Sequence, residues 1–183
     1  YYNKKNIGIF KKNVLSRSFF KMIEIQNDYN VLKMAHKKVK IAFIAEAPGG
    51  FIEACYKIRN KNNEDKYYTI SLIDNKSSNI PTWYNLQKKM VHKKNIEICN
   101  GYDNTGDIYK LINIFNYINY VGKHTCDIVT ADGGFDFTTD FVNQEYNFAR
   151  LFLCEIIIGV NLQKLGGNFV IKCFDLTNIL NLK

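Results

Sequence analysis

The stretch Lys40-Ile-Ala-Phe-Ile-Ala-Glu-Ala-Pro-Gly-Gly-Phe51 decides the fold of this chain. Its first part, Lys40–Ala45, is an apolar run that predicts a buried β-strand. The following Pro48-Gly49-Gly50 predicts a turn, and the residues from Phe51 to about Arg59 have the apolar spacing of a helix. A buried strand that passes through a glycine turn into a helix is the building unit of an α/β fold.

The same alternation of strands and helices continues along the chain. Apolar runs predict further strands at Tyr67–Ile73, Ile96–Cys99, Asp127–Ala131 and Asn168–Phe174. Helices are predicted at Asn13–Ile25, at Asp107–Val121 and at Asn143–Leu165, the last ending at Gly166-Gly167. In the second of these helices the regularly spaced apolar residues are Ile108, Leu111, Ile112, Phe115 and Ile118. This order predicts a Rossmann-like, mostly parallel sheet with helices on both faces, in which ligands bind beyond the carboxyl ends of the strands.

Composition describes an ordinary globular chain with a basic surface. The 183 residues are 46% hydrophobic and 23% charged, which suits one domain with a full core and excludes wholesale disorder. The net charge of +8 suits a phosphate-bearing partner, although lysine-rich runs are as readily explained as solvated surface.

The cysteines and histidines argue for a reducing environment and against a metal. The five cysteines form no C-x-x-C pair, so we expect buried thiols in an intracellular, cytoplasmic protein, or in a viral factory, virion or nucleus according to its source. The three histidines are too scattered for a zinc site. The longest apolar stretch, Leu151–Leu162, is interrupted by Glu155 and is too short to span a bilayer.

The glycine turn after the first strand is the expected ligand site. Glycines allow a ligand to approach the backbone closely, although a tight strand-to-helix connection without a ligand is an equally ordinary use of such a turn. The turn lacks both the G-x-G-x-x-G of a dinucleotide site and the G-x-x-x-x-G-K-[ST] of a P-loop. A ligand without a phosphate cradle is therefore favoured.

Two aspartates lie where they could contact a nucleoside. Asp74 follows the second predicted strand, where a carboxylate can accept hydrogen bonds from ribose hydroxyls, or it is an ordinary turn residue. Asp107 could accept a hydrogen bond from an adenine amino group, or it could be the N-cap of the helix that follows.

Two further polar residues interrupt apolar surroundings at strand ends. Asp132 directly follows the strand Asp127–Ala131, although Asp-Gly pairs also form plain turns. Lys172 lies in an otherwise apolar strand, and a lysine is rarely buried without a partner. Either Lys172 reaches water from an edge strand, or its ammonium lies beside Asp132 between adjacent strands.

Together these segments resemble the FtsJ-like ribose 2′-O-methyltransferases, and among them the mRNA cap enzymes of eukaryotes and large DNA viruses. Ala45–Phe51 resembles the cofactor motif of that family, and Gly166–Asp175 resembles the strand that bears its catalytic lysine. Thr130–Phe135, with Asn143–Glu145 after it, resembles the motif around its catalytic aspartate. Ser16–Met22 resembles the helix that supplies the first lysine of a Lys-Asp-Lys-Glu tetrad.

The resemblance implies a site, residue by residue. Lys21, Asp132 and Lys172 fill three places of the tetrad, and no glutamate follows Lys172 to fill the fourth. We therefore expect a fragment of a longer protein, with 1–183 as a single methyltransferase domain, 1–30 as a helical extension and the closing strands missing. S-adenosylmethionine is the implied cofactor and no metal is implied; the expected cofactor-binding residues are Glu46, Ala47, Pro48, Gly49, Gly50, Phe51, Asp74, Asp107 and Asp132.

The implied activity is methyl transfer to a ribose 2′-hydroxyl of RNA, with the cap-proximal nucleotide of mRNA as the expected target. Lys172 is expected to orient the hydroxyl, and its service as the base stays open. The alternatives are an enzyme acting on ribosomal or transfer RNA, and an inactive RNA-binding scaffold. A nicotinamide-dependent oxidoreductase is disfavoured by the missing dinucleotide motif. The expected partner is RNA with a capped 5′ end and no membrane, while the oligomeric state is left open.

Overall fold

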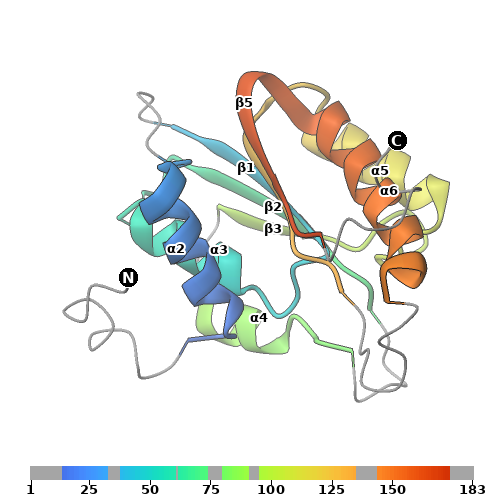
Figure 1. The fold of residues 1–183 in the computed structure, drawn as a ribbon, viewed down its shortest axis with the longest axis horizontal. Coiled ribbons are helices and arrows are strands. Elements are labelled where there is room, and N and C mark those ends of the chain that lie inside the picture. The colour runs from blue at the N-terminus through green and yellow to red at the C-terminus, as the bar shows by residue number, and fades with distance from the viewer. Residues whose placement is uncertain are drawn as a thin grey trace.

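The computed structural model describes residues 14–32, 38–60, 62–73, 80–90, 95–134 and 144–173. Five parallel strands form one sheet in the order β3-β2-β1-β4-β5 (Figure 1). The strands are β1 (Lys40–Ile44), β2 (Lys66–Ile70), β3 (Ile96–Cys99), β4 (Cys126–Ala131) and β5 (Gln163–Ile171). The helices are α2 (Ser18–Tyr29), α3 (Gly50–Ile58), α4 (Tyr84–Met90), α5 (Leu111–Val121) and α6 (Gln144–Leu162).

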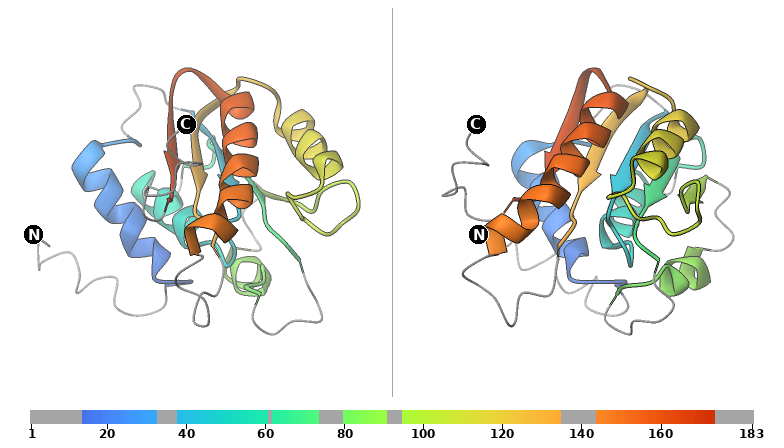
Figure 2. Two further views of the ribbon diagram at one scale, coloured as in Figure 1. Left: turned by 45° about the vertical axis from the view of Figure 1, so that its right-hand side comes forward. Right: turned by 90° about the vertical axis from the view of Figure 1, so that its right-hand side faces the viewer.

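Helices cover both faces of the sheet, with α2, α3 and α4 on one side and α5 and α6 on the other (Figures 1 and 2). The residues of β1 alternate between the two cores that result. Ile41 and Phe43 pack with α2 and α3, whereas Ala42 and Ile44 pack with α5 and α6. A parallel strand buried on both faces reads as an unbroken apolar run, which is why β1 was recognisable. The predicted Rossmann-like fold is confirmed.

The order of the strands creates a crevice next to β1. The chain runs outward from β1 to β2 and β3, then returns to place β4 on the opposite side of β1. The connections that leave the carboxyl ends of β1 and β4 therefore diverge, and a ligand site is expected between them.

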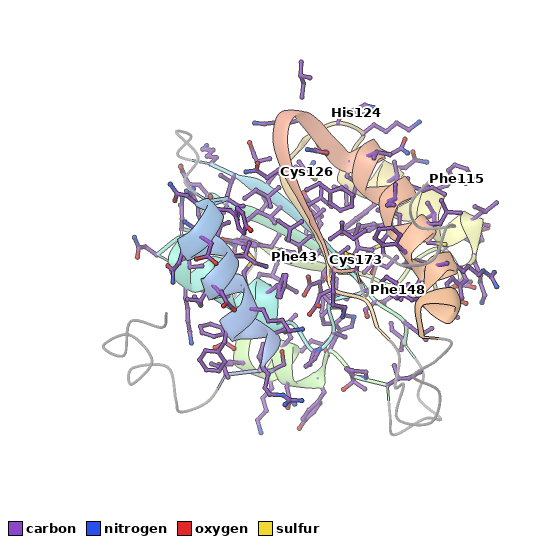
Figure 3. All side chains as sticks on the ribbon, viewed as in Figure 1. Phe43, Phe115, His124, Cys126, Phe148 and Cys173 are labelled. Carbon is purple, nitrogen blue, oxygen red and sulfur yellow. The ribbon has the colours of Figure 1, made fainter. Side chains whose placement is uncertain are left out.

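Helix α5 is confirmed, although it begins at Leu111 and not at Asp107, and its predicted apolar face is only partly correct: Ile108, before the helix, and Ile118 are buried. Leu111, Ile112 and Phe115 are 62%, 48% and 60% exposed, and Figure 3 shows Phe115 on the outer side of the helix. The buried face carries Ile114, Ile118 and Val121 together with two residues that bear polar groups, Asn113 and Tyr117. The hydroxyl of Tyr117 lies 2.9 Å from the Tyr68 carbonyl oxygen, and the amide of Asn113 donates to Asp103 and to the Asp107 carbonyl. Apolar spacing alone could not detect a face whose polar groups are satisfied by tertiary partners.

Two predicted boundaries also require correction. Helix α2 begins at Ser18, later than predicted, and extends to Tyr29. Helix α6 ends at Leu162, and Gly167 lies inside β5 rather than after a helix. A Cβ atom at Gly167 would meet the Asp127 and Cys126 carbonyl oxygens at 2.9 and 3.0 Å. Gly167 therefore permits the close approach of β5 to β4 at a register shift in their pairing.

None of the helices in the described ranges is long and apolar enough to cross a membrane. All five cysteines are free thiols. Cys55, Cys99 and Cys126 are buried as predicted, whereas the prediction is wrong for Cys173, which is exposed, and Cys154 is only partly buried.

The polar face of α5 can be tested by removing one buried hydroxyl. Tyr117→Phe should lower the free energy of unfolding by about 1–2 kcal/mol, because it removes the hydrogen bonds of a buried hydroxyl to the Phe43 and Tyr68 carbonyl oxygens. Tyr120→Phe is the matched control: its hydroxyl donates to Glu97 on the half-exposed outer face. Its effect should stay below about 0.5 kcal/mol. Equal effects in urea unfolding would contradict this account of the α5 packing.

Candidate active site

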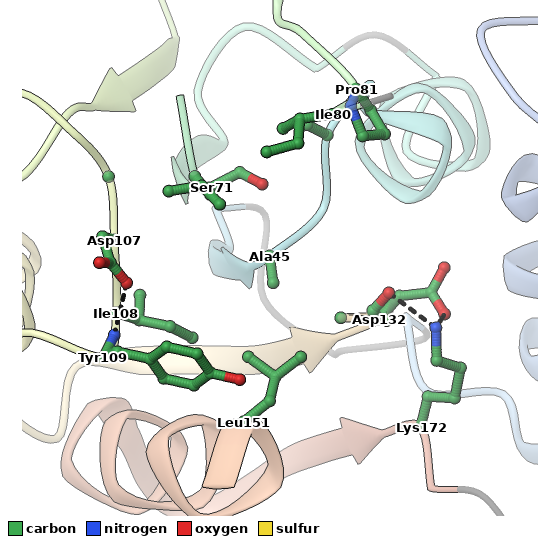
Figure 4. A pocket seen from close by; sticks show the side chains of 15 residues that line it. Ala45, Ser71, Ile80, Pro81, Asp107, Ile108, Tyr109, Asp132, Leu151 and Lys172 are labelled. Carbon is green, nitrogen blue, oxygen red and sulfur yellow. Dashed lines mark hydrogen bonds and ion pairs between the residues drawn. The ribbon is translucent and has the colours of Figure 1, made fainter. Parts of the chain in front are cut away.

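A pocket of about 470 Å³ lies at the carboxyl ends of the strands, beside the crevice between β1 and β4 (Figure 4). Its volume falls in the range of small-molecule sites. Its walls are apolar where Leu72, Ile80, Pro81 and Ile108 line it. Charged groups lie at two places, with Asp107 on one side and Asp132 and Lys172 on the other. The pocket thus combines flat apolar walls with separated charged groups.

Three residues that the sequence singled out meet at one side of this pocket. The ammonium of Lys172 lies 3.0 Å from Asp132 Oδ1 and donates to the Asp132 backbone carbonyl at 2.9 Å. The ammonium of Lys21, on α2, lies 3.7 Å from the same carboxylate oxygen. The Lys21 side chain is 56% exposed, whereas that of Asp132 is 11% exposed. One nearly buried carboxylate therefore holds two ammonium groups from different elements.

Strand β5 is an edge strand of the sheet among the described residues. This agrees with the interpretation that placed Lys172 on an edge strand. Lys172 itself follows the end of β5, and its backbone N–H donates to the Ala131 carbonyl at 2.9 Å. This bond continues the pairing with β4 and turns the lysine toward Asp132. The side chain is 27% exposed and paired, which agrees with the interpretation that it lies beside Asp132.

The glycine turn contributes less directly to the pocket than its sequence suggested. Within Glu46–Phe51, Ala47 lines the pocket, whereas Pro48, Gly49 and Gly50 do not. Gly49 has a φ of +103°, which favours glycine, and faces the side chain of Leu86 on α4. A Cβ at Gly50 would collide with the hydroxyls of Ser16 and Ser18. These glycines therefore allow α4 and the start of α2, and not a ligand, to approach the turn closely.

The two ends of this turn are buried within the protein. Phe51 is 3% exposed and belongs to the hydrophobic core on α3, so its expected contact with a ligand is replaced by core packing. Glu46 is also 3% exposed, and its Oε1 accepts a hydrogen bond from the Thr130 hydroxyl at 2.9 Å. Burial raises the pKa of Glu46 well above its ordinary value, and the nearby Asp132 adds to the rise.

The aspartates expected near a nucleoside have different outcomes. Asp107 lines the pocket, and its Oδ1 accepts the Tyr109 backbone N–H at 2.9 Å. It is not the N-cap of α5, because that position is Lys110. The guanidinium of Arg150 lies 4.4 Å from the centre of the Tyr109 ring on the same wall. Asp74 lies outside the described residues, as do Phe135 and Phe174.

Sequence reasoning missed Glu155 as part of the site. This side chain lies on α6 with 0% exposure, and its Oε1 accepts the Gly133 backbone N–H at 3.0 Å. Burial raises its pKa from the ordinary 4.5 to about 8, while the Gly133 hydrogen bond and Lys172 act in the opposite direction. The signal was present in the sequence, because a single acid in the apolar run Leu151–Leu162 needs a buried partner.

The pocket suits an adenosine-containing ligand that carries no phosphate. Leu72, Pro81 and Ile108 offer apolar surfaces of the kind that pack on a purine, and Asp107 offers a carboxylate beside them. Gly133 and Gly134 line the end nearest Asp132. These residues fit the parts of S-adenosylmethionine. Among the described residues, no group of histidine, cysteine and acidic side chains could hold a metal ion.

The fold and the pocket together define a class of protein. A parallel sheet with this strand order, and a pocket at its switch point with carboxylates in place of a phosphate cradle, is the arrangement of a Rossmann-like methyltransferase. The chain belongs to the FtsJ-like methyltransferase family, whose family model matches residues 14–182. The resemblance noted in the sequence is confirmed.

Three of the curated relatives carry the same name. The cap-specific mRNA (nucleoside-2′-O-)-methyltransferase 1 of Trypanosoma brucei brucei is 42% identical over 82 residues, which are 42% of this chain and 21% of the relative. Its namesake in Xenopus laevis is 25% identical over 187 residues, covering 92% of this chain and 21% of the relative. Its namesake in Mus musculus is 30% identical over 139 residues, which are 74% of this chain and 16% of the relative. The chain thus spans about a fifth of the length of these relatives.

A solved structure shows the same fold. A Plasmodium falciparum protein, provisionally named a ribosomal RNA methyltransferase, superposes with a TM-score of 0.59 at 20% sequence identity. The superposition covers 92% of this chain and 82% of that chain.

The raised pKa of Glu155 predicts a specific dependence of stability on pH. Between pH 4.5 and about 8 the folded state keeps a proton on Glu155 that the unfolded state has lost. The unfolded state binds fewer protons, so this group makes stability fall as the pH rises through that window. In Glu155→Gln this contribution is absent. The stability of the variant relative to wild type should therefore rise by up to about 1.4 kcal/mol per pH unit. Parallel curves of Tm against pH for the two proteins would contradict the prediction.

Proposed function

We propose that this domain catalyses the transfer of a methyl group from S-adenosylmethionine to the 2′-hydroxyl of an RNA ribose, at the cap-proximal nucleotide of mRNA. The observation that carries the proposal is the meeting of Lys21, Asp132 and Lys172 at the edge of the pocket. The family of the chain and the names of its curated relatives support the same chemistry and the mRNA target. The net charge of +8 suits an RNA partner.

The pocket residues would hold the cofactor in a fixed order. Leu72, Pro81 and Ile108 would pack on the adenine, and Asp107 would accept a hydrogen bond from its amino group. Ala47 and Gly133 would border the part of the ligand next to Asp132. S-adenosylmethionine supplies an electrophilic methyl group on a positively charged sulfur. Asp132 would then place a carboxylate near that positive charge.

The three site residues would act mainly by position. Lys172 is held by two contacts with Asp132, so its ammonium has a fixed place at the edge of the pocket. From there it would orient the ribose oxygen toward the methyl carbon, and the proton that this oxygen releases would pass to water or to Lys172. Lys21 is more exposed, and would contact the RNA from the solvent side. Fixing reacting groups in the correct geometry is worth several kcal/mol, roughly 7–11 in favourable cases.

Lys172→Ala is the most direct test among substitutions. In the complete natural protein it should reduce methyl transfer by at least about 100-fold, because it removes the group that orients the ribose oxygen. The affinity for S-adenosylmethionine, measured by calorimetry, should change little. The control is Lys164→Ala, since Lys164 is a partly buried lysine that pairs with Asp127 at the opposite end of β4. Near-normal transfer by Lys172→Ala would remove Lys172 from the mechanism.

The target is tested by comparing RNA ends. With RNA of one sequence, capped transcripts should be methylated and triphosphate-ended transcripts should not, with a rate difference of at least ~10-fold. Structured ribosomal and transfer RNA fragments serve as the competing substrates. Preference for those fragments would assign the domain to ribosomal or transfer RNA and overturn the cap proposal.

A further inference from the structure

The turn that carries Asp132 rests on a buried acid. Gly133 is buried, and a Cβ at this position would collide with Glu155 Oε1 and lie 3.0 Å from the side chain of Leu151. The Gly133 backbone N–H donates to that same Glu155 oxygen at 3.0 Å. Glu155 is 0% exposed and comes from α6, which packs on β4 and β5. The absence of a side chain at Gly133 is therefore what allows Glu155 to reach the turn.

A second acid supports the end of β4 from the side of β1. Glu46 follows β1, is 3% exposed and accepts the Thr130 hydroxyl at 2.9 Å. Thr130 lies two residues before Asp132 on β4. In the described part of the chain, the second carboxyl oxygen of both Glu46 and Glu155 is buried without a hydrogen-bond partner. Such an atom is costly, so two of them beside one turn call for a functional reason.

The surroundings favour the neutral form of Glu155. Burial is the main cause that raises its pKa to about 8, and Asp132 contributes in the same direction. The groups that face it are Asp132 after β4, Lys172 after β5, Glu46 after β1 and Tyr109 before α5. Cys154 and Arg150 lie on its own helix. A neutral acid can accept the Gly133 bond without adding negative charge next to the Lys172–Asp132 pair.

We propose that Glu155 is a positioning residue: through its hydrogen bond to the Gly133 amide it holds the Asp132 turn where Asp132 meets Lys172. The inference rests on the proposed function, because it assigns Glu155 a part in the same methyl transfer. Glu155 is not among the residues that line the pocket, and it would act through Gly133 and Asp132. Ionisation of Glu155 places a carboxylate beside Asp132, which repels Asp132 and competes for Lys172.

Two substitutions of Glu155 in the complete natural protein separate position from charge. Glu155→Gln keeps an acceptor oxygen and cannot ionise, so its kcat near pH 7 should lie within about 3-fold of wild type. Glu155→Leu fills the space without an acceptor, so kcat should fall about 10- to 100-fold. For Glu155→Leu, KM for both substrates and the Kd for S-adenosylmethionine should stay within about 3-fold of wild type. Asp127→Asn is the matched control, since Asp127 is a buried acid at the other end of β4 whose carboxylate also accepts a backbone N–H. It should leave kcat unchanged.

The pH profile distinguishes this role from a merely structural one. The ratio of wild-type to Glu155→Gln kcat should decline between pH 7 and 9, because Glu155 ionises in the wild type alone. The ¹⁵N–¹H resonance of Gly133 should titrate over the same interval in the wild type and stay constant in Glu155→Gln. That resonance reports on Glu155 whether or not any RNA is methylated, whereas an inactive wild type would contradict the proposed function itself. A constant kcat ratio together with a Gly133 signal that does not titrate would overturn the inference. A Glu155→Leu protein that is folded and fully active would also overturn the inference.

Discussion

The contact between Asp132 and Lys172 depends on a property of parallel sheets: the carboxyl ends of neighbouring strands meet at one edge. Strands β4 and β5 are neighbours, and the Lys172 N–H bond to Ala131 continues their pairing past the end of β5. The ammonium of Lys172 therefore reaches both the carboxylate and the backbone carbonyl of Asp132. Residues 40 positions apart in the sequence become one charged unit at the edge of a pocket. Without this pairing the pocket would lack the ammonium group that the proposed mechanism uses to orient a hydroxyl.

The remaining elements serve to hold that unit and to bring Lys21 to it. Helix α2 lies close enough to place Lys21 because Gly50 has no side chain where Ser16 and Ser18 sit. A buried acid on α3, Glu53, accepts the Leu15 N–H at 2.8 Å and pairs with Lys89 of α4. The segment before α2 and the helix α4 are thus both fixed to α3. The glycine turn builds the site by assembling helices, in addition to bordering the pocket through Ala47.

Much of this arrangement was accessible from the sequence, for definite physical reasons. Apolar runs marked β1 and, around the polar Asp127 and Thr130, β4, because strands buried on both faces are mostly apolar. Lys172 stood out because a lysine in such a run needs a partner, and Asp132 was placed at the same edge by the strand before it. The position of Lys21 came from the family resemblance, since nothing in the composition of α2 marks it.

What the sequence could not supply depends on tertiary contacts. The buried face of α5 contains Asn113 and Tyr117, whose partners lie in other segments. In the sequence Gly167 has the appearance of a helix C-terminal glycine. Only the structure shows that it lies against the backbone carbonyls of β4. The contact of Glu155 with the Gly133 N–H could be recognised only once α6 was seen to pack against the turn that carries Asp132. In each case the role of a polar or glycine residue depends on a contact with a residue that is distant in the chain.

The central claim is that Asp132, Lys172 and Lys21 direct a methyl group to a ribose oxygen. The measurement that tests it most directly is the chemical position of the transferred methyl group. The complete protein is incubated with RNA and isotopically labelled S-adenosylmethionine, and the digested nucleosides are analysed by mass spectrometry. The account predicts label on the ribose 2′ oxygen, in a nucleoside whose base mass is unchanged. Label on a base, or no label in any RNA, would contradict it.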